Sequence, residues 1–401
     1  MSAVSAGRAK VILAVLFLGS FVLGTAELIV PGVLNLVAAD LAVPIPAAGM
    51  LVTANALGLA LGGPLLTAVT IRLPRRAILT GVLGLFAAAN LALVLTDDYS
   101  LILAARVLSG AAQGLFIAVA LEAGTSIVPP ERMGRAISAV VSGFTVAAAL
   151  GVPLGTTAGQ ALGWRGTFAA IVVLAALTLV AIAVIVPPVP ASTGGIGSQA
   201  RYALAPRVLA VLGFGVLLCA AIFATLTYLA PFLEQVTGVS GTSISVFLLV
   251  YGVATAFGSF GGGRFADRDA SRTLIVGSCG LALSLLTLFL AGSIAALVVV
   301  ALLALGIFGM AMVPAMQYRV VRLAGPGAQF AQSLPASFTN LGVAFGSAAG
   351  GMALSGFSPA ATVLTGFVFA CAAAVVAWAT AFLRPPPVRE LPHAGEAARI
   401  R

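Results

Sequence analysis

The sequence predicts an all-α membrane protein of twelve transmembrane helices, folded as two pseudo-symmetric six-helix bundles. Hydrophobic residues make up 61% of its 401 residues and charged residues only 8%, whereas soluble proteins carry about 25% charge. The apolar runs have the length of about 20 residues that a spanning helix needs, and they follow one another almost end to end. They are longer and less interrupted than the alternating segments of about 10 residues in a membrane β-barrel. A water-soluble globule and a barrel are both excluded.

The expected spans follow the apolar runs in chain order, and the breaks between them coincide with most of the charged residues. The 46 glycines fit membrane helices, whose backbones approach closely through small residues. The three cysteines lie far apart within the runs, so we interpret them as small buried residues and expect no metal site. The spans are placed at residues 11–35, 47–69, 77–95, 101–127, 136–161, 168–186, 208–232, 243–265, 273–292, 295–316, 334–355 and 360–383.

The distribution of charge predicts the orientation in the membrane. Of the 20 Lys and Arg residues, all but Arg106 and Arg165 fall at the chain ends or in alternate loops, on one side of the expected bilayer. The opposite side carries acidic residues at Asp40, Asp97, Asp98 and Glu234. The positive-inside rule therefore predicts that both termini are cytoplasmic. The same rule accounts for the net charge of +9 without a nucleic-acid partner.

A polar segment divides the chain into two halves. Residues 187–207 are rich in Pro, Gly and Ser and lack apolar periodicity, which indicates a flexible cytoplasmic linker. We expect an N-terminal bundle over 1–186, a C-terminal bundle over 208–383 and a cytoplasmic tail over 384–401. The halves also match at an offset of 196 residues, which pairs Gly62, Arg72, Arg76, Gly110 and Gly155 with Gly258, Arg268, Arg272, Gly306 and Gly351. Parallel six-span repeats are one transporter architecture, with the binding site near the midplane between the halves.

Glu27 is the leading candidate for chemistry, because an ionised and unpaired carboxylate at membrane depth is costly. Helical spacing places it on one face with Ser20, Gly24 and Pro31. Pro31 has no N–H for the carbonyl of Glu27, which loosens the backbone there. Burial favours the neutral carboxyl and a nearby cation favours the ionised one, so Glu27 is placed to take up and release a proton. The alternative is a structural ion pair or a polar lock between helices.

Arg106 is the second candidate, at a depth in the fourth span near that of Glu27. Its helix face is small or polar at Ser109, Gly110 and Gln113, so we expect this face to line the interior and Arg106 to pair with Glu27, directly or through water. The alternative is that Arg106 extends outward and holds the fold. Glu122 projects away from Arg106, and we expect it to extend to the cytoplasmic surface or to pair with Arg132 or Arg135.

Two further sets of residues are candidates for roles in transport. The fifth span carries Gly143, Gly151, Pro153 and Gly155, which permit close helix contact and a bend. They serve packing alone, or they form a seam that seals and opens. Polar side chains within the spans are candidates to line a substrate cavity, with a simple interhelical hydrogen bond as the alternative. These are Asn55, Gln113, Tyr251 and Asn340.

Several runs resemble the motifs of the major facilitator superfamily over nearly the whole chain. The run Gly263–Arg268, which includes Asp267, is similar to that superfamily's loop motif, and Arg72 belongs to the first-half copy, where Ile71 replaces the aspartate. The run Arg106–Gly114 is similar to the fourth-span motif, whose arginine is linked to proton coupling. The run Gly151–Gly155, followed by Gly163-Trp164-Arg165, resembles the fifth-span motif of drug:proton antiporters. Glu27 before Pro31-Gly32 adds a likeness to chloramphenicol-resistance and arabinose or sugar-efflux exporters.

The resemblance implies a proton-coupled exporter of small amphipathic compounds that works by alternating access. The proton is the coupling ion and no other cofactor is expected; the partners are the substrate, protons and the lipid bilayer, and the chain is expected to be a monomer. Ala- and Arg-rich usage favours a GC-rich bacterium, hence its plasma (inner) membrane. The alternative is a sugar or metabolite transporter, efflux or symport, on the same fold. An enzyme is not expected, because the spans hold no histidine and no paired acids.

Overall fold

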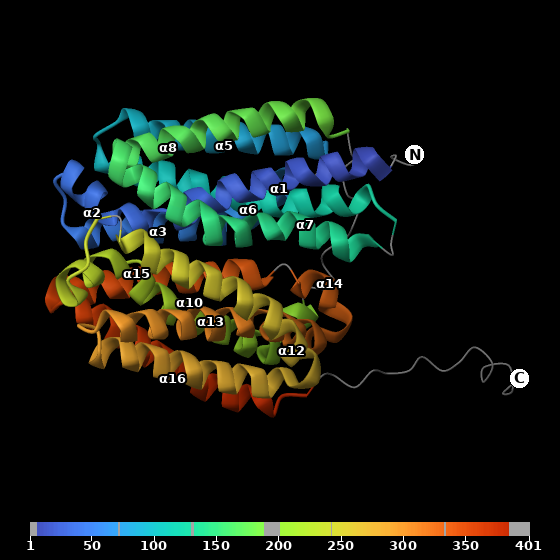
Figure 1. Ribbon diagram of the computed structural model, residues 1–401. Helices are drawn as coiled ribbons and strands as arrows, with labels where there is room; N and C mark the ends of the chain where they lie inside the picture. Colours follow the sequence, from blue (N-terminus) through green and yellow to red (C-terminus); the bar gives the residue numbers. More distant parts are fainter. Residues whose placement is uncertain are drawn as a thin grey trace, which may run out of the picture.

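The computed structural model describes residues 6–70, 73–129, 132–187, 201–241, 243–332 and 334–384, and within these ranges every regular element is a helix. The long helices run side by side (Figure 1), with those of the first half of the chain in the upper part of the view and those of the second half below. Each half has its own apolar core, and a few residues belong to the core of the other half: Val152, Tyr228, Val343 and Ala344.

The first half begins with a broken helix, and two of its spans contain a π-helical turn. Its elements are α1 (Ala6–Leu28), α2 (Val30–Asp40), α3 (Ile45–Leu57), the π-turn η1 (Gly58–Gly62), α4 (Gly63–Thr70), α5 (Arg75–Leu95), α6 (Tyr99–Ser126), α7 (Met133–Val146), the π-turn η3 (Ala147–Gly151) and α8 (Val152–Ile185).

The second half begins at Pro206 and contains a further π-turn near its first break. Its elements are α10 (Pro206–Leu226), α11 (Leu229–Phe232), the π-turn η4 (Leu233–Thr237), α12 (Ser243–Leu290), α13 (Ala295–Ala324), the 3₁₀ turn η5 (Gly325–Gly327), α14 (Ala328–Ala331), α15 (Leu334–Gly356) and α16 (Pro359–Ala381).

Each of the twelve predicted spans falls on helical backbone. Ten stretches of the described chain are long and apolar enough to cross a membrane, and one of them, Met133–Ile185, is 53 residues long and contains two predicted spans. The helix α15 coincides with the predicted span 334–355. The expected all-α membrane fold is therefore confirmed.

Two predicted breaks between spans are present but shorter than expected, because the chain turns at a single non-helical residue in each. Gly163 bends α8 with φ +76°, a conformation that glycine adopts without steric cost. Asp269 bends α12 with φ −158° and ψ 94°, and its carboxylate accepts a hydrogen bond from the N–H of Arg272 at 3.0 Å, which caps the segment that follows. The helix α13 also continues to Ala324, beyond its predicted end at 316, because helical hydrogen bonds do not stop where charged residues begin.

The predicted internal repeat is visible as equivalent close contacts in the two halves. A Cβ atom on Gly110 would collide with the carbonyl of Asn55 and the N–H of Leu59, and one on Gly306 would meet the carbonyl of Tyr251 and the N–H of Thr255. Each second-half residue lies 196 positions after its first-half counterpart. The two bundles are thus pseudo-symmetric at the level of single backbone contacts.

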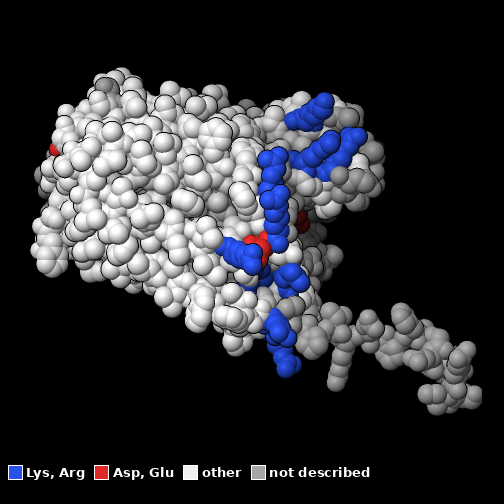
Figure 2. All heavy atoms as spheres, turned by 60° about the horizontal axis from the view of Figure 1, so that its bottom comes forward, with Lys and Arg blue, Asp and Glu red and all other residues white. Residues whose placement is uncertain are grey.

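Charged side chains separate the two ends of the molecule. Figure 2 shows Lys and Arg gathered at one end, with the rest of that face almost free of charge. We call this the basic end. The order of the helices places there the start of α5 at Arg75 and the pocket that Arg268 and Arg322 line. The opposite, acidic end includes Asp40 and Glu234. This separation matches the pattern used to predict cytoplasmic termini, and the orientation itself stays a prediction.

Most of the expected linker lies outside the described residues, which resume at 201. Residues 201–203 form a helical turn in which Ala203 is fully buried, and α10 follows at Pro206. Residues 385–401 of the expected tail also lie outside the described part. The domain boundaries therefore stay predictions.

Candidate functional site

Glu27 lies in the last turn of α1, beside the break between α1 and α2. The N–H of Ile29 donates to the carbonyl of Thr25 at 3.0 Å, and the N–H of Gly32 donates to the carbonyl of Ile29 at 2.9 Å. The helical path is therefore interrupted close to Pro31, as its missing N–H predicts. The break places the carboxylate at the junction of α1 and α2.

A chain of hydrogen bonds connects Glu27 to two other helices of the first bundle. The amide of Gln113, on α6, donates to the carboxylate of Glu27. The amide of Asn55, on α3, donates to the side-chain oxygen of Gln113 at 3.4 Å. Asn55 and Gln113 are buried, whereas Glu27 is partly exposed. The carboxylate thus faces polar groups inside the bundle, and three sequence candidates form one network.

Arg106 lies beside this network but binds backbone carbonyls. Its side chain is fully buried; Nε donates to the carbonyl of Leu51 at 3.2 Å and Nη1 to the carbonyl of Ala26 at 3.1 Å. The ion pairs within 4.0 Å among the described residues do not include Arg106 and Glu27, although the two charges attract each other through space. The expected direct pair is replaced by this longer-range attraction. The alternative of an outward-reaching arginine is wrong.

The second bundle contributes Tyr251 and Cys219 near the carboxylate. Tyr251, on α12, lines a small pocket of about 30 Å³ between the bundles, which also includes Leu28 and Pro31. That volume is about enough for one water molecule. Cys219, on α10, lies close enough to Glu27 for an electrostatic interaction. From the sequence, Cys219 is predicted only to be a small buried residue, because no local pattern distinguishes it.

Asn340 is not brought into this network. Its amide donates to the carbonyl of Ala336 in its own helix, α15, at 3.0 Å, and its side-chain oxygen is buried without a partner. The described contacts therefore connect Asn55, Gln113 and Glu27 and place Tyr251 nearby, while Asn340 stays apart.

The glycines of the fifth span pack against the first span of the same bundle. A Cβ atom on Gly143 would meet the carbonyl of Phe17, one on Gly151 the side chain of Thr25, and one on Gly155 the side chain of Ile29. These contacts follow α1 from Phe17 to the break at Ile29. The π-turn η3 lies within the series and ends shortly before Pro153. Because Pro153 has no N–H, it cannot donate to the carbonyl of Ala149, and the regular α-helical hydrogen bonds are interrupted there.

Polar contacts between the two bundles were not predicted. The hydroxyls of Thr53 on α3 and Ser347 on α15 are 2.5 Å apart. Within the second bundle, the hydroxyl of Tyr228 donates to the carbonyl of the same Ser347 at 2.8 Å. The amide of Asn35 on α2 donates to the carboxylate of Glu234 at 2.5 Å. Ser and Thr are common in membrane helices, so their sequence carries no signal of which pairs meet across the bundles.

At the basic end, Glu122 forms an ion pair with Arg75 at 2.9 Å. The prediction that Glu122 pairs with Arg132 or Arg135 is therefore wrong. The start of α5 lies beside the end of α6, and this brings Arg75, the first residue of α5, to Glu122. Arg72 lies outside the described residues. Asp267 lies in α12, but its side chain is outside the described part. Arg268 is exposed at the same end.

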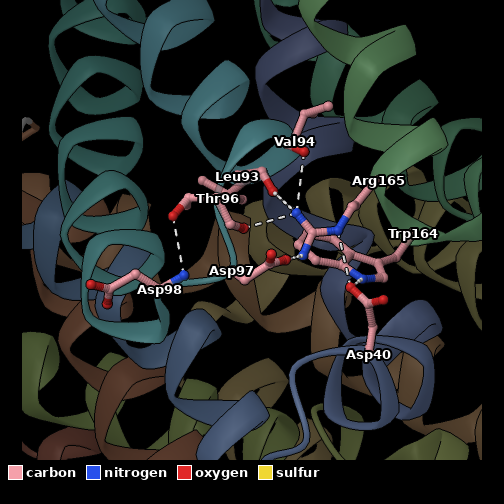
Figure 3. Close-up of polar contacts among 8 residues, drawn as sticks. All are labelled: Asp40, Leu93, Val94, Thr96, Asp97, Asp98, Trp164 and Arg165. Atoms are coloured by element: carbon pink, nitrogen blue, oxygen red, sulfur yellow. Dashed lines mark hydrogen bonds and ion pairs between the residues drawn. The ribbon is translucent and has the colours of Figure 1, made fainter.

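At the acidic end, Arg165 holds three segments together (Figure 3). Its Nε donates to Asp40 at 3.0 Å and its Nη2 to Asp97 at 2.5 Å. The indole of Trp164 also donates to Asp40 at 3.0 Å. Arg165 further donates to the carbonyls that end α5, those of Leu93, Val94 and Thr96. The Gly-Trp-Arg run of the sequence thus forms a clasp between α2, the α5–α6 loop and the bend of α8.

Comparison with known proteins places this architecture in a family. The Major Facilitator Superfamily matches residues 16–230 and 212–400, so the chain belongs to this superfamily. The chain is 31% identical over 350 residues to the inner membrane transport protein YdhP of Escherichia coli, covering 85% of this chain and 88% of YdhP. It is 36% identical over 259 residues to a chloramphenicol resistance protein of Streptomyces lividans, covering 63% and 66%.

The fold is also similar to that of a solved transporter. The crystal structure of a bacterial homolog of the human lysosomal transporter Spinster matches with a TM-score of 0.78 and 16% identity, over 94% of this chain and 98% of that one. Members of the superfamily transport small molecules and usually work as monomers. The protein is therefore a multi-pass membrane transporter and not an enzyme.

Proposed function

We propose that the protein is a proton-coupled transporter that exports small amphipathic compounds across the bacterial inner membrane, with Glu27 as the proton-binding group. One observation carries the proposal: a carboxylate at membrane depth that accepts a hydrogen bond from Gln113 while staying partly exposed. An intramembrane ionisable group is by default a functional one. Glu27 is partly exposed at the break between α1 and α2, and a hydrogen bond to Gln113 and the charge of Arg106 act on its carboxylate there.

Proton uptake changes the contacts of α1. A neutral Glu27 loses its attraction to Arg106 and accepts a weaker hydrogen bond from Gln113. The same helix packs along the glycines of the fifth span and, through Arg106, is bonded to α6. A change of charge at Glu27 therefore acts on the helices that surround the midplane. The two bundles then alternate in access, with both termini cytoplasmic.

The driving force comes from the proton gradient. Moving one elementary charge through the membrane potential is worth about 2.3 kcal/mol per 100 mV. Exchange of one external proton for a neutral compound therefore supports accumulation against a gradient. Arg106 supports the cycle by holding the last turn of α1 in place through the carbonyl of Ala26.

The residues that meet between the bundles near Glu27 favour an amphipathic substrate over a sugar by their chemistry, since the pocket of about 30 Å³ there holds no more than about one water molecule. The pocket between the bundles is apolar except for Tyr251, and its lining is Leu28, Pro31, Ala148, Val152, Phe223, Leu226, Leu248 and Tyr251. Sugar sites need several convergent polar groups, which this lining does not provide. The likeness to a chloramphenicol resistance protein supports phenicols as the first compounds to test, with sugar efflux as the alternative.

Transport into inverted membrane vesicles tests the proposal. With an imposed proton gradient, vesicles that contain the protein should accumulate a phenicol, and Glu27→Gln should abolish this proton-driven accumulation. Exchange of labelled for unlabelled phenicol across the same vesicles should persist, because exchange needs no net proton movement. Glu122→Gln is the matched control and should keep proton-driven accumulation, because Glu122 is paired with Arg75 at the basic end. Normal accumulation by Glu27→Gln would remove Glu27 from the mechanism.

A second measurement separates the substrate from the coupling. Counterflow with arabinose and with a phenicol in parallel should show exchange of the phenicol only. Exchange of arabinose alone would establish the sugar-efflux alternative. The role of Glu27 is tested separately, by the accumulation assay with a proton gradient.

A further inference from the structure

A pocket of about 370 Å³ lies at the basic end of the second bundle, away from Glu27. It is formed where α12 bends, between that bend and the ends of α13 and α16. Its volume falls in the range of roughly 300–1,000 Å³ that is typical of ligand sites. The polar residues that line it are Arg268, Asp269, Ser271, Tyr318, Arg319 and Arg322.

Arg319 is a buried cation in this lining with unused hydrogen-bonding capacity. Its side chain is only 8% exposed. One terminal nitrogen donates to the hydroxyl of Ser271 and the other to the carbonyl of Thr380, while Nε is buried without a partner. Arg268 and Arg322 are exposed around it, and Arg322 lies over the ring of Tyr318 at 5.6 Å. Three guanidinium groups therefore surround one pocket.

Among the described side chains of the pocket, three guanidinium groups face one carboxylate, that of Asp269, which attracts Arg319 through space. The carboxylate of Asp269 is already paired with Arg272 at 3.2 Å, outside the lining. In the first bundle, the equivalent place holds the Arg75–Glu122 ion pair.

The repeat shows what has changed between the bundles. At the offset of 196 residues, Arg75 corresponds to Ser271 and Glu122 to Tyr318. The second bundle has therefore lost the carboxylate of Glu122 and has gained Arg319 and Arg322 beside that place, while Asp267 and Asp269 stand where the first bundle has Ile71 and Leu73. An anion from outside the chain can supply a partner for the buried Nε of Arg319.

We propose that this pocket binds a phosphate group, carried by the headgroup of an anionic phospholipid or by free inorganic phosphate. Guanidinium groups match the geometry of phosphate oxygens and bind them with charge-assisted hydrogen bonds. Next to the pocket, Trp378 and Phe382 on the α16 side are 61% and 69% exposed. Exposed aromatic residues at helix ends are typical of the level of lipid headgroups, so acyl chains can continue from the pocket along α16.

Thermal unfolding of the full chain in detergent distinguishes the sources of phosphate. Phosphatidylglycerol, phosphatidylcholine and inorganic phosphate are titrated separately at constant ionic strength. Saturable stabilisation by phosphatidylglycerol and not by phosphatidylcholine identifies the headgroup of an anionic lipid. Stabilisation by inorganic phosphate alone identifies a free anion at the same site. No saturable effect of either phosphate source would overturn the proposal.

Variants assign the effect to the pocket. Arg322→Gln should raise the half-saturating concentration about tenfold. We prefer this change to one at Arg319, because Arg319 is buried and its replacement would itself destabilise the fold. Tyr318→Glu, which restores the carboxylate of the first bundle, should abolish the effect. Arg264→Gln removes an exposed charge at the same end outside the lining and should leave it unchanged. Equal losses in Arg264→Gln and Arg322→Gln would show a diffuse charge effect and contradict a site.

The fluorescence of Trp378 provides a second readout that does not depend on unfolding. Brominated phosphatidylglycerol should quench it at lower concentration than brominated phosphatidylcholine, in a variant with Trp164→Phe that leaves Trp378 as the only tryptophan. Arg322→Gln should remove this difference between the lipids. Equal quenching by both lipids in the Trp164→Phe protein would contradict binding of an anionic headgroup. Free phosphate would then be the remaining ligand, and the unfolding experiment tests it.

Discussion

At the scale of single residues, the site combines a side chain that carries charge with one that secures its position. Glu27 accepts a hydrogen bond from Gln113 and remains partly exposed, whereas Arg106 is fully buried and bonded to the carbonyls of Ala26 and Leu51. Buried polar groups must be satisfied, because an unpaired one costs about 1–3 kcal/mol. Arg106 therefore fixes the helix geometry around the group that we propose to titrate.

Replacement of Arg106 by lysine tests this positioning role. A lysine ammonium is compact and cannot reproduce the fork that reaches two carbonyls on different helices. We expect Arg106→Lys to lower the free energy of unfolding by about 1–3 kcal/mol, measured by thermal unfolding in detergent. The same change at exposed Arg264 should stay within about 0.5 kcal/mol. Equal effects at both positions would show that the carbonyl contacts of Arg106 contribute nothing specific.

The clasp at the acidic end predicts a dependence of stability on pH. The indole of Trp164 lowers the pKa of Asp40 below its usual value, and Arg165 lowers it further, with burial opposing. A carboxylate with a lowered pKa contributes stability above its unfolded pKa of about 3.9 and loses it as pH falls through the folded value.

The variant Asp40→Asn removes that contribution. Its loss of stability relative to the parent should be constant from about pH 5 to 8 and should shrink below about pH 4. Because Asp40 is 47% exposed, the loss should not exceed about 1 kcal/mol. Melting temperatures of both proteins across this pH range provide the measurement. In an Arg165→Gln background the effect should be smaller, and a loss that does not depend on pH would refute the linkage.

At the scale of elements, close contacts between helices depend on glycine at defined positions. Gly110 brings α6 against the backbone of α3, and Gly306 does the same between α13 and α12. Because the neighbouring atoms belong to the backbone or to the Cβ of Ala254, a larger side chain cannot be accommodated by a rotamer change. The helices themselves must separate.

Alanine substitutions measure this constraint in both halves of the repeat. We expect Gly110→Ala and Gly306→Ala each to lower the free energy of unfolding by about 1–3 kcal/mol, through overpacking. Gly81→Ala is the control, because a Cβ atom there meets nothing within 4 Å and alanine favours a helix by about 0.5–1 kcal/mol. If Gly110→Ala were as stable as Gly81→Ala, the close approach of α6 and α3 would be incorrect.

At the scale of the whole molecule, the two bundles meet through a few direct side-chain contacts. Thr53 and Ser347 are in hydrogen-bond contact across the bundles, as are Asn35 and Glu234. Alternating access requires contacts of this kind to form and break. A covalent link at one of them should therefore hold the transporter in one state.

A disulfide between Thr53→Cys and Ser347→Cys tests this requirement. In a background with the native cysteines replaced by serine, oxidation should abolish most of the initial rate of transport, and a reductant should restore that rate. Each single-cysteine variant should keep its activity under the same oxidation. Full activity of the crosslinked protein would mean that this contact persists throughout the cycle.

Much of this architecture could be predicted from the sequence. The twelve apolar runs coincide with helical backbone, and the 196-residue offset recurs as paired contacts at Gly110 and Gly306. The burial of Arg106, Ser109 and Gln113 also agrees with their predicted interior face. The bends at Gly163 and Asp269 were predicted as longer loops, because hydropathy records the loss of apolar residues and not the backbone angles of a single residue.

The composition and order of residues alone determined the spans, the charge asymmetry between the ends and the presence of an acid at Glu27 near a helix break. These depend on hydrophobicity and backbone chemistry, which act locally along the chain. Only the tertiary structure decided that Gln113 binds Glu27, that Arg106 binds carbonyls, and that Glu122 pairs with Arg75. Hydrogen-bond partners depend on which helix faces meet and at what depth, and distant parts of the chain set that packing together.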